Sequence, residues 1–150
     1  MAYIKYKEIT KYFNFSKNLN LKELPWYSLD YVFDDEKVLV AFKTKRDHAV
    51  FTDKKIILFD NTNLFLRKQI TIIPYKSISS SSIIYMKGKT EISLFLDSGY
   101  PLRLKFVNTK RDEKTRLRNL FSCISMYANN QGHTNDIEKV LIANEFGKKD

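Results

Sequence analysis

The sequence predicts a mainly β domain with flanking helices, in which seven antiparallel strands are followed by a C-terminal helix. From Val38 to Val107 the apolar residues recur with a period of two, in short runs separated by turn-forming residues. After Asn108 the apolar period becomes that of a helix. Because a helix with one apolar face needs a partner to bury it, we expect the strands and the helix to form one folded unit.

Each predicted strand is short and bounded by residues that tolerate turn geometry, which favours antiparallel neighbours. The predicted strands are residues 38–44, 49–52, 55–60, 65–73, 77–86, 90–96 and 102–107. The last strand alternates most cleanly, with Leu104 and Phe106 on one face and Arg103 and Lys105 on the other. This pattern predicts one buried face and one wet face. The serine run 79–82 alternates poorly and is interpreted as a bulge or an edge.

The predicted helix has its apolar residues at the spacing of one face. They are Leu117, Leu120, Phe121, Ile124 and Ala128. Asp112 and Glu113 fall in the first turn, where carboxylates oppose the positive end of the helix dipole. The single cysteine, Cys123, lies beside the stripe and is interpreted as a small hydrophobe.

The two ends of the chain are predicted as flanks of the central domain, residues 37–128. Residues 1–36 are aromatic and charged, and we expect helices there. Residues 129–150 are expected to form a linker and a short helix. A length of 150 residues fits one domain.

Composition and charge limit the class of protein. No segment approaches the roughly 18 apolar residues of a membrane span, and the N-terminus has no apolar leader, so we expect a cytoplasmic, unanchored protein. One cysteine excludes an intramolecular disulfide. The net charge is +9, and residues 38–108 hold twelve basic and five acidic residues, which is +7 of that total. A basic surface could attract phosphates or nucleic acid, and the alternative is a lysine-rich solvated surface.

Catalytic equipment is sparse in the sequence. The two histidines, His48 and His133, are placed in a turn and a linker, and the four glycines are isolated, so neither a metal cluster nor a phosphate loop is indicated. The acidic run 34–36 is interpreted as a solvated turn before a strand. We therefore expect a non-enzymatic protein with no cofactor and no metal ion.

Two stretches carry a resemblance to a known family. Residues 43–60 place an Arg-Asp pair before an apolar strand, then Thr, a turn, a basic residue and a second apolar strand. Residues 73–78 read Ile-Pro-Tyr-Lys-Ser-Ile. In this order and spacing, these stretches resemble the bacterial pleckstrin-homology-like (PH-like) family. The resemblance implies a seven-stranded antiparallel sandwich or partly open barrel, with two near-orthogonal sheets and the C-terminal helix in one open corner. It covers residues 37–128, and the flanks lie outside it.

A basic cluster is the first candidate binding site. It consists of Lys43, Lys45, Arg46, Lys54 and Lys55. Two neighbouring turns could bring these cations to one open end of the sandwich, where they would bind an anionic ligand such as a phosphorylated lipid headgroup or a nucleotide. The alternative is a solvated rim. Nucleic acid is a second alternative, since aromatic residues alternate with the basic ones; these are Phe65, Tyr75, Tyr85 and Tyr100.

The leading hypothesis is a binding or scaffolding domain that self-associates and presents a surface to another protein. The resemblance implies ring-like oligomers, and the aromatic N-terminal flank offers material for the contact. The candidate contact residues are Tyr12, Phe13, Phe15, Trp26 and Tyr27. The same residues could instead pack on their own domain, and this alternative stays open here.

Overall fold

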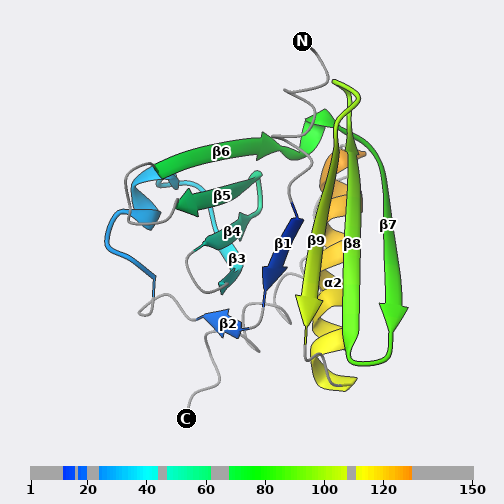
Figure 1. Ribbon diagram of the computed structural model, residues 1–150. Coiled ribbons are helices and arrows are strands. Elements are labelled where there is room, and N and C mark those ends of the chain that lie inside the picture. The colour runs from blue at the N-terminus through cyan, green and yellow to red at the C-terminus, as the bar shows by residue number, and fades with distance from the viewer. Residues whose placement is uncertain are drawn as a thin grey trace.

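The computed structural model describes residues 12–15, 17–19, 24–43, 47–61, 68–107 and 111–129, arranged as two sheets and a C-terminal helix (Figure 1). The elements in chain order are β1 (Tyr12–Phe15), β2 (Lys17–Leu19), the 3-10 helix η2 (Ser28–Tyr31), β3 (Val38–Lys43), β4 (His48–Thr52), β5 (Lys55–Asn61), β6 (Lys68–Pro74), the 3-10 helix η4 (Tyr75–Ser77), β7 (Ile78–Met86), β8 (Lys89–Leu96), β9 (Pro101–Val107) and α2 (Arg111–Ala128). The seven predicted strands correspond to β3 through β9, so the predicted fold class is confirmed.

The strands divide into two sheets that do not close into a continuous barrel. The first sheet has the order β2-β3-β4-β5-β6, and the second has the order β1-β9-β8-β7. From β3 to β6 and from β7 to β9 each strand pairs antiparallel with the next, as short connections require. In Figure 1 the strands of the second sheet cross the direction of β5 and β6 steeply.

The N-terminal flank adds one strand to each sheet, which corrects the expected helices. β1 pairs in parallel with β9, and β2 pairs antiparallel with β3. The edges of β3 and β9 would otherwise expose unpaired N–H and C=O groups, and pairing with β1 and β2 satisfies them. Aromatic residues also favour strands, so tertiary pairing overrides the partial helical pattern. The short helix expected within residues 129–150 lies outside the described residues, which end at 129.

The main core lies between the two sheets and α2. α2 packs against η4, β7 and β8, and buries Leu117, Leu120, Cys123 and Ile124. Ile92 and Leu104 meet this face from the second sheet, as the alternation predicted. No helix in the described ranges is long and apolar enough to cross a membrane.

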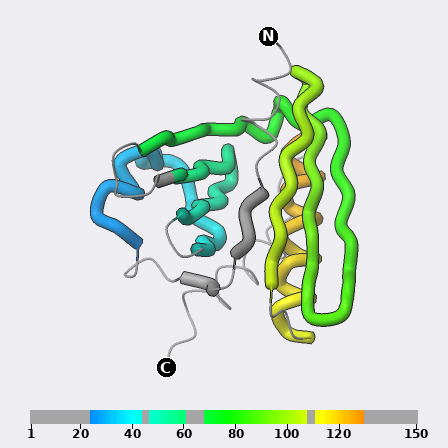
Figure 2. Tube along the Cα trace, in the orientation of Figure 1, coloured from blue at the N-terminus to red at the C-terminus, as the bar shows by residue number. Residues whose placement is uncertain are grey.

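A second, smaller core lies on the outer face of the first sheet. Residues 24–36 lie along the first sheet on the side away from α2, at the left of Figure 2. Their apolar side chains cover outward-facing residues of β3, β4 and β5, so these strands are buried on both faces. The covered residues are Ala41, Val50, Ile57 and Phe59. The flank is therefore part of the folded unit.

Candidate protein-interaction surface

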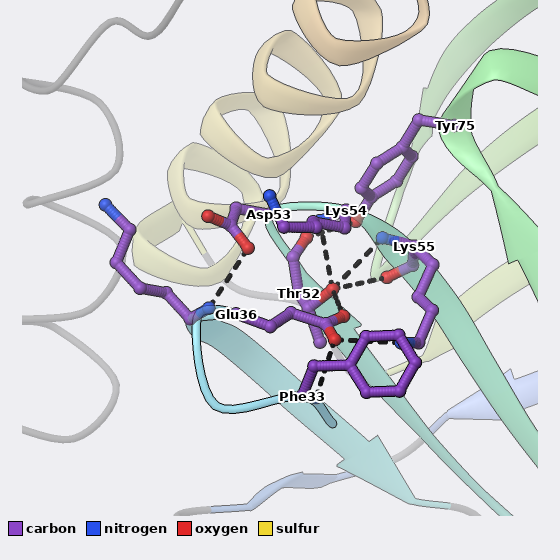
Figure 3. Close-up of polar contacts among 8 residues, drawn as sticks. Phe33, Glu36, Thr52, Asp53, Lys54, Lys55 and Tyr75 are labelled. Atoms are coloured by element: carbon purple, nitrogen blue, oxygen red, sulfur yellow. Dashed lines mark hydrogen bonds and ion pairs between the residues drawn. The ribbon is translucent and has the colours of Figure 1, made fainter. Parts of the chain in front are cut away.

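The segment 24–36 is fixed to the first sheet at its C-terminal end by a buried ion pair. The Nζ of Lys55 lies 2.8 Å from Oε1 of Glu36, and both side chains are almost completely removed from solvent. The backbone N–H of Phe33 donates to the same carboxylate oxygen at 2.9 Å. The hydroxyl of Thr52 donates to Oε2 of Glu36 (Figure 3). Every oxygen of this carboxylate is thus hydrogen bonded, as a buried charge requires.

The partners of Glu36 belong to the hairpin that joins β4 and β5. The Thr52 hydroxyl also accepts hydrogen bonds from the N–H groups of Lys54 and Lys55, each at 3.0 Å, which is a usual role of threonine in turns. Next to it, Lys37 and Asp53 exchange two hydrogen bonds, both at 3.0 Å. The hairpin and the segment are therefore fastened to each other at several atoms.

The charge state of Glu36 follows from this environment. Burial opposes ionisation, but the hydrogen bonds from Lys55, Thr52 and the Phe33 N–H outweigh it and lower the pKa of Glu36 below its usual value. The interpretation of 34–36 as a solvated turn is therefore wrong for Glu36, whereas Asp34 and Asp35 are exposed.

Tyr75 connects this cluster to the joint between the two sheets. Its hydroxyl donates to the carbonyl of Thr52 at 2.6 Å, and its ring lies 5.0 Å from that of Tyr127 on α2. Burial raises the pKa of Tyr75 well above its usual value, so the phenol remains a donor.

Replacing Tyr75 with phenylalanine is expected to lower the free energy of unfolding by about 1–2 kcal/mol, because a buried carbonyl loses its donor. Urea unfolding measures this loss, with Tyr85→Phe on an exposed tyrosine as the matched control. Equal stability of the two variants would show that the Tyr75 hydroxyl contributes nothing.

The middle of the segment is fixed by an aromatic cluster around His48. The imidazole of His48 stacks on Phe59 with centroids 4.2 Å apart, and its Nε2 lies 2.8 Å from Oγ of Ser28. Tyr27 packs edge-on against Phe59 and carries the ammonium of Lys68 at 3.4 Å above its ring. Burial, with a smaller effect from Lys68, lowers the pKa of His48 to about 4. His48 thus belongs to a buried strand rather than to a turn.

Large apolar side chains next to these two anchors face solvent. Trp26 is 85% exposed and Phe33 is 66% exposed, and Leu29 is also exposed. Trp26 meets Tyr27 edge-on at 5.7 Å, and Phe33 lies under Lys55 at 4.1 Å. Exposed aromatic side chains on a fixed segment are typical of interaction surfaces, because little conformational entropy remains to be lost on binding.

The candidate contact residues of the flank have different positions. Trp26 lies on this exposed surface, whereas Tyr27 packs on its own domain. Tyr12, Phe13 and Phe15 belong to β1, and their side chains lie outside what the structure describes.

The structure does not bring together the three described members of the basic cluster, Lys43, Lys54 and Lys55. Lys43 is exposed beside His48 in the register of β3 and β4, whereas Lys54 lies in the turn at the opposite end of β4. Consecutive turns of an antiparallel meander lie at opposite ends of the sheet, which the sequence argument overlooked. Lys55 is buried against Glu36, and Lys45 and Arg46 lie outside the described residues.

The aromatic residues considered for nucleic acid are also dispersed. Tyr75 is buried, Tyr85 is exposed on β7, and Tyr100 is half-buried after β8. Phe65 lies outside the described residues. Within the described ranges, no group of three or more His, Cys, Asp or Glu side chains could hold a metal ion.

The fold and this surface define a β-sandwich of the pleckstrin-homology type with an N-terminal segment docked on its first sheet. A sequence model described as the bacterial PH domain matches residues 9–143. The chain belongs to the bacterial PH domain family. This match extends into both flanks, beyond the 37–128 range of the resemblance.

Individual proteins are similar to parts of this chain. The Bacillus subtilis protein YjqA is 47% identical over 53 residues, which span 35% of this chain and 42% of that protein. A protein with a pleckstrin-homology domain from Shewanella loihica has a TM-score of 0.59 at 22% identity, covering 74% of this chain and 95% of that one.

Two further solved structures show the same fold. A PH-domain-containing protein from Exiguobacterium sibiricum has a TM-score of 0.57 at 16% identity, covering 77% of this chain and 62% of that one. A pleckstrin homology domain from Shewanella amazonensis has a TM-score of 0.53 at 23% identity, covering 73% and 89%. The PH fold is in general that of a binding or scaffold domain, and PH domains are generally non-catalytic.

Proposed function

We propose that this chain is a non-catalytic binding and scaffolding domain that self-associates through the exposed apolar residues of segment 24–36. The observation that carries the proposal is the exposure of Trp26 and Phe33 on a segment held at its middle by the His48 cluster and at its C-terminal end by the Glu36 ion pair. A well-placed Trp contributes strongly to binding when its surroundings are already ordered.

Charge supports a second copy as the partner. Residues 24–36 contain no basic residue, and three exposed aspartates, Asp30, Asp34 and Asp35, follow Trp26 in the same segment. The chain as a whole carries +9, and all of this positive excess lies outside the segment, which itself holds four acidic residues. An acidic, apolar segment of one copy is therefore attracted by the net positive charge of the rest of another copy. Such a contact joins two different surfaces, and repeated contacts of this kind form rings or chains.

Substituting Trp26 with serine is expected to weaken self-association by about thirtyfold, the effect of a contact worth about 2 kcal/mol. Folding should change little, because Trp26 is almost fully exposed. Sedimentation velocity over a concentration series measures both the subunit mass and its dependence on concentration.

Tyr85→Ser is the matched control, since it removes an exposed aromatic residue from the second sheet. Charge reversal by Asp34→Lys with Asp35→Lys should also weaken assembly, and added salt should weaken assembly of the unchanged protein. Equal assembly by the Trp26→Ser and Tyr85→Ser variants would refute the proposed surface.

A further inference from the structure

β7 presents an unusually open edge. It is the outer strand of the second sheet, and among the described strands none pairs with the side away from β8 (Figure 1). All nine residues of Ile78–Met86 are uncharged and none is proline. The single irregularity is a bulge near the start, between Ile78 and Ser80. Proteins usually protect a long edge with charge, proline or a central bulge, and from Ser80 onward β7 has none of these.

The backbone of this edge is oriented to accept another strand. The hairpin of β7 and β8 closes at Met86 and Lys89 around Lys87 and Gly88, and Gly88 has the positive φ of 72° that such a turn favours. Counting back from Met86, the alternate residues Tyr85, Ile83 and Ser81 direct their N–H and C=O groups away from β8.

Side chains beside the edge offer apolar contact. Ile84 and Met86 share the outer face of the second sheet and are exposed. Phe95 on β8 lies opposite Ser80 in the register and is also exposed on that face. An added strand would therefore gain side-chain contacts as well as backbone hydrogen bonds.

Positive charge is concentrated at the hairpin end of β7. Lys87 and Lys89 are exposed, and the Nζ of Lys114 on α2 donates to the carbonyl of Met86 at 2.6 Å. Arg118 is exposed one helical turn after Lys114, on the same side of α2. At the other end of β7 the exposed Lys76 is near an acid, since the N–H of Asp97 donates to the carbonyl of Ser77 at 2.7 Å.

The acidic residues near the hairpin end have other orientations. Asp112 lies on the side of α2 opposite Lys114 by helical spacing, and Glu113 lies toward the packed face. Glu91 lies on the outer side of the sheet, directly across from Lys105 on β9 as well as from Ile84 on β7. The field at the edge of β7 therefore runs from strongly positive at Met86 to nearly balanced at Ile78.

We propose that the edge of β7 binds an extended segment of another protein as an added antiparallel strand, with acidic residues at the N-terminal end of that segment. Antiparallel addition continues the pattern of the sheet and places this end beside Lys87, Lys89, Lys114 and Arg118. A second copy of β7 fits poorly, because it carries no acidic residue to place beside these four cations. Segment 24–36 of a second copy is formed of turns and a 3-10 helix, so it is not available as a strand. The proposal is thus independent of self-association.

Fluorescence anisotropy of the full chain with designed peptides tests this assignment. The probe is a labelled peptide that begins with a run of acidic residues and continues with alternating threonine and valine. Two matched peptides carry the acidic run at the C-terminal end, or lysines in its place. We expect the dissociation constant of the first peptide to be at least about tenfold lower than that of either control. A difference of this size is what one or two exposed charge contacts contribute when the peptide pairs in the proposed direction. Binding should weaken with salt.

Two variants keep the test decisive. Lys87→Glu with Lys89→Glu is expected to reverse the preference toward the lysine peptide. Ser81→Pro removes one outward N–H and is expected to abolish binding while the unfolding midpoint stays close to that of the unchanged protein. Hydrogen exchange should show new protection at Ser81, Ile83 and Tyr85 when peptide is bound. The proposal would be overturned by equal binding of all three peptides, or by full binding of the first peptide to a folded Ser81→Pro variant. It would also be overturned if Ser81→Pro lowered the subunit number of the protein, because a second copy would then occupy the edge.

Discussion

Replacement of Glu36 with alanine is expected to lower the free energy of unfolding by about 3 kcal/mol. The substitution leaves the ammonium of Lys55 buried without its carboxylate, and removing one member of a buried ion pair is more costly than replacing both. It also removes the acceptor of the Phe33 N–H and of the Thr52 hydroxyl. Urea unfolding followed by circular dichroism measures the difference.

Two controls separate the effect of breaking the ion pair from the effect of removing any one carboxylate. Asp35→Ala removes the neighbouring exposed carboxylate and should change stability by no more than about 0.5 kcal/mol. The double variant Glu36→Gln with Lys55→Met should recover much of the loss, since no charge stays buried. A Glu36→Ala variant as stable as Asp35→Ala would contradict the role given to this pair.

The stability of the protein is expected to fall by about 2 kcal/mol between pH 7 and pH 5 because of His48. The folded-state pKa of His48 is about 4, below the ordinary value of 6.5, so only the unfolded chain binds this proton in that interval. Stability contributed by neutral His48 is therefore complete above pH 6.5, declines as the pH falls, and stops declining below about 4. The positive charge of Lys68, which lies over the Tyr27 ring of the same cluster, disfavours protonation of His48 further.

Comparison with His48→Gln isolates this residue. The slope of unfolding free energy against pH between 5 and 6.5 should be flatter in the variant, whatever its absolute stability. His133 is present in both proteins and cancels in the comparison. The lowered pKa of Glu36 affects stability in a different interval, since its contribution is complete above about 4.5 and is lost as the pH falls toward the folded-state pKa. Parallel slopes for the two proteins would contradict a buried neutral imidazole.

The strands of the sandwich could be predicted because their information is local. In β9, for example, Leu102, Leu104 and Phe106 alternate with Arg103 and Lys105, and the same alternation appears as burial in the structure. β1 and β2 have no such pattern of their own. They form because β9 and β3 each leave an edge to pair with, which depends on contacts about ninety and twenty residues away in sequence.

The outer cover of the first sheet was missed, although one pattern in the sequence indicates it. Residues 56–59 form an unbroken apolar run, which is typical of a strand buried on both faces. Glu36 could not be recognised from its neighbours, because its partner Lys55 follows nineteen residues later and meets it only through the β4–β5 hairpin. The described members of the basic cluster lie apart because consecutive strands run in opposite directions. The composition of the sequence gives no information on strand direction.

These contacts connect the fold to the proposed function. The Glu36 ion pair and the His48 cluster hold segment 24–36 in place, and the proposed role of Trp26 and Phe33 in binding depends on this order. Removing residues 1–36 would also remove β1, β2 and the cover of Phe59, so such a truncation would test folding rather than assembly. Single substitutions on the exposed side chains are the sharper approach.

Native mass spectrometry of the unchanged protein, sprayed from a concentration series in volatile buffer, tests self-association most directly. The account predicts a discrete multimer whose population grows with concentration. A monomer at every concentration would contradict it.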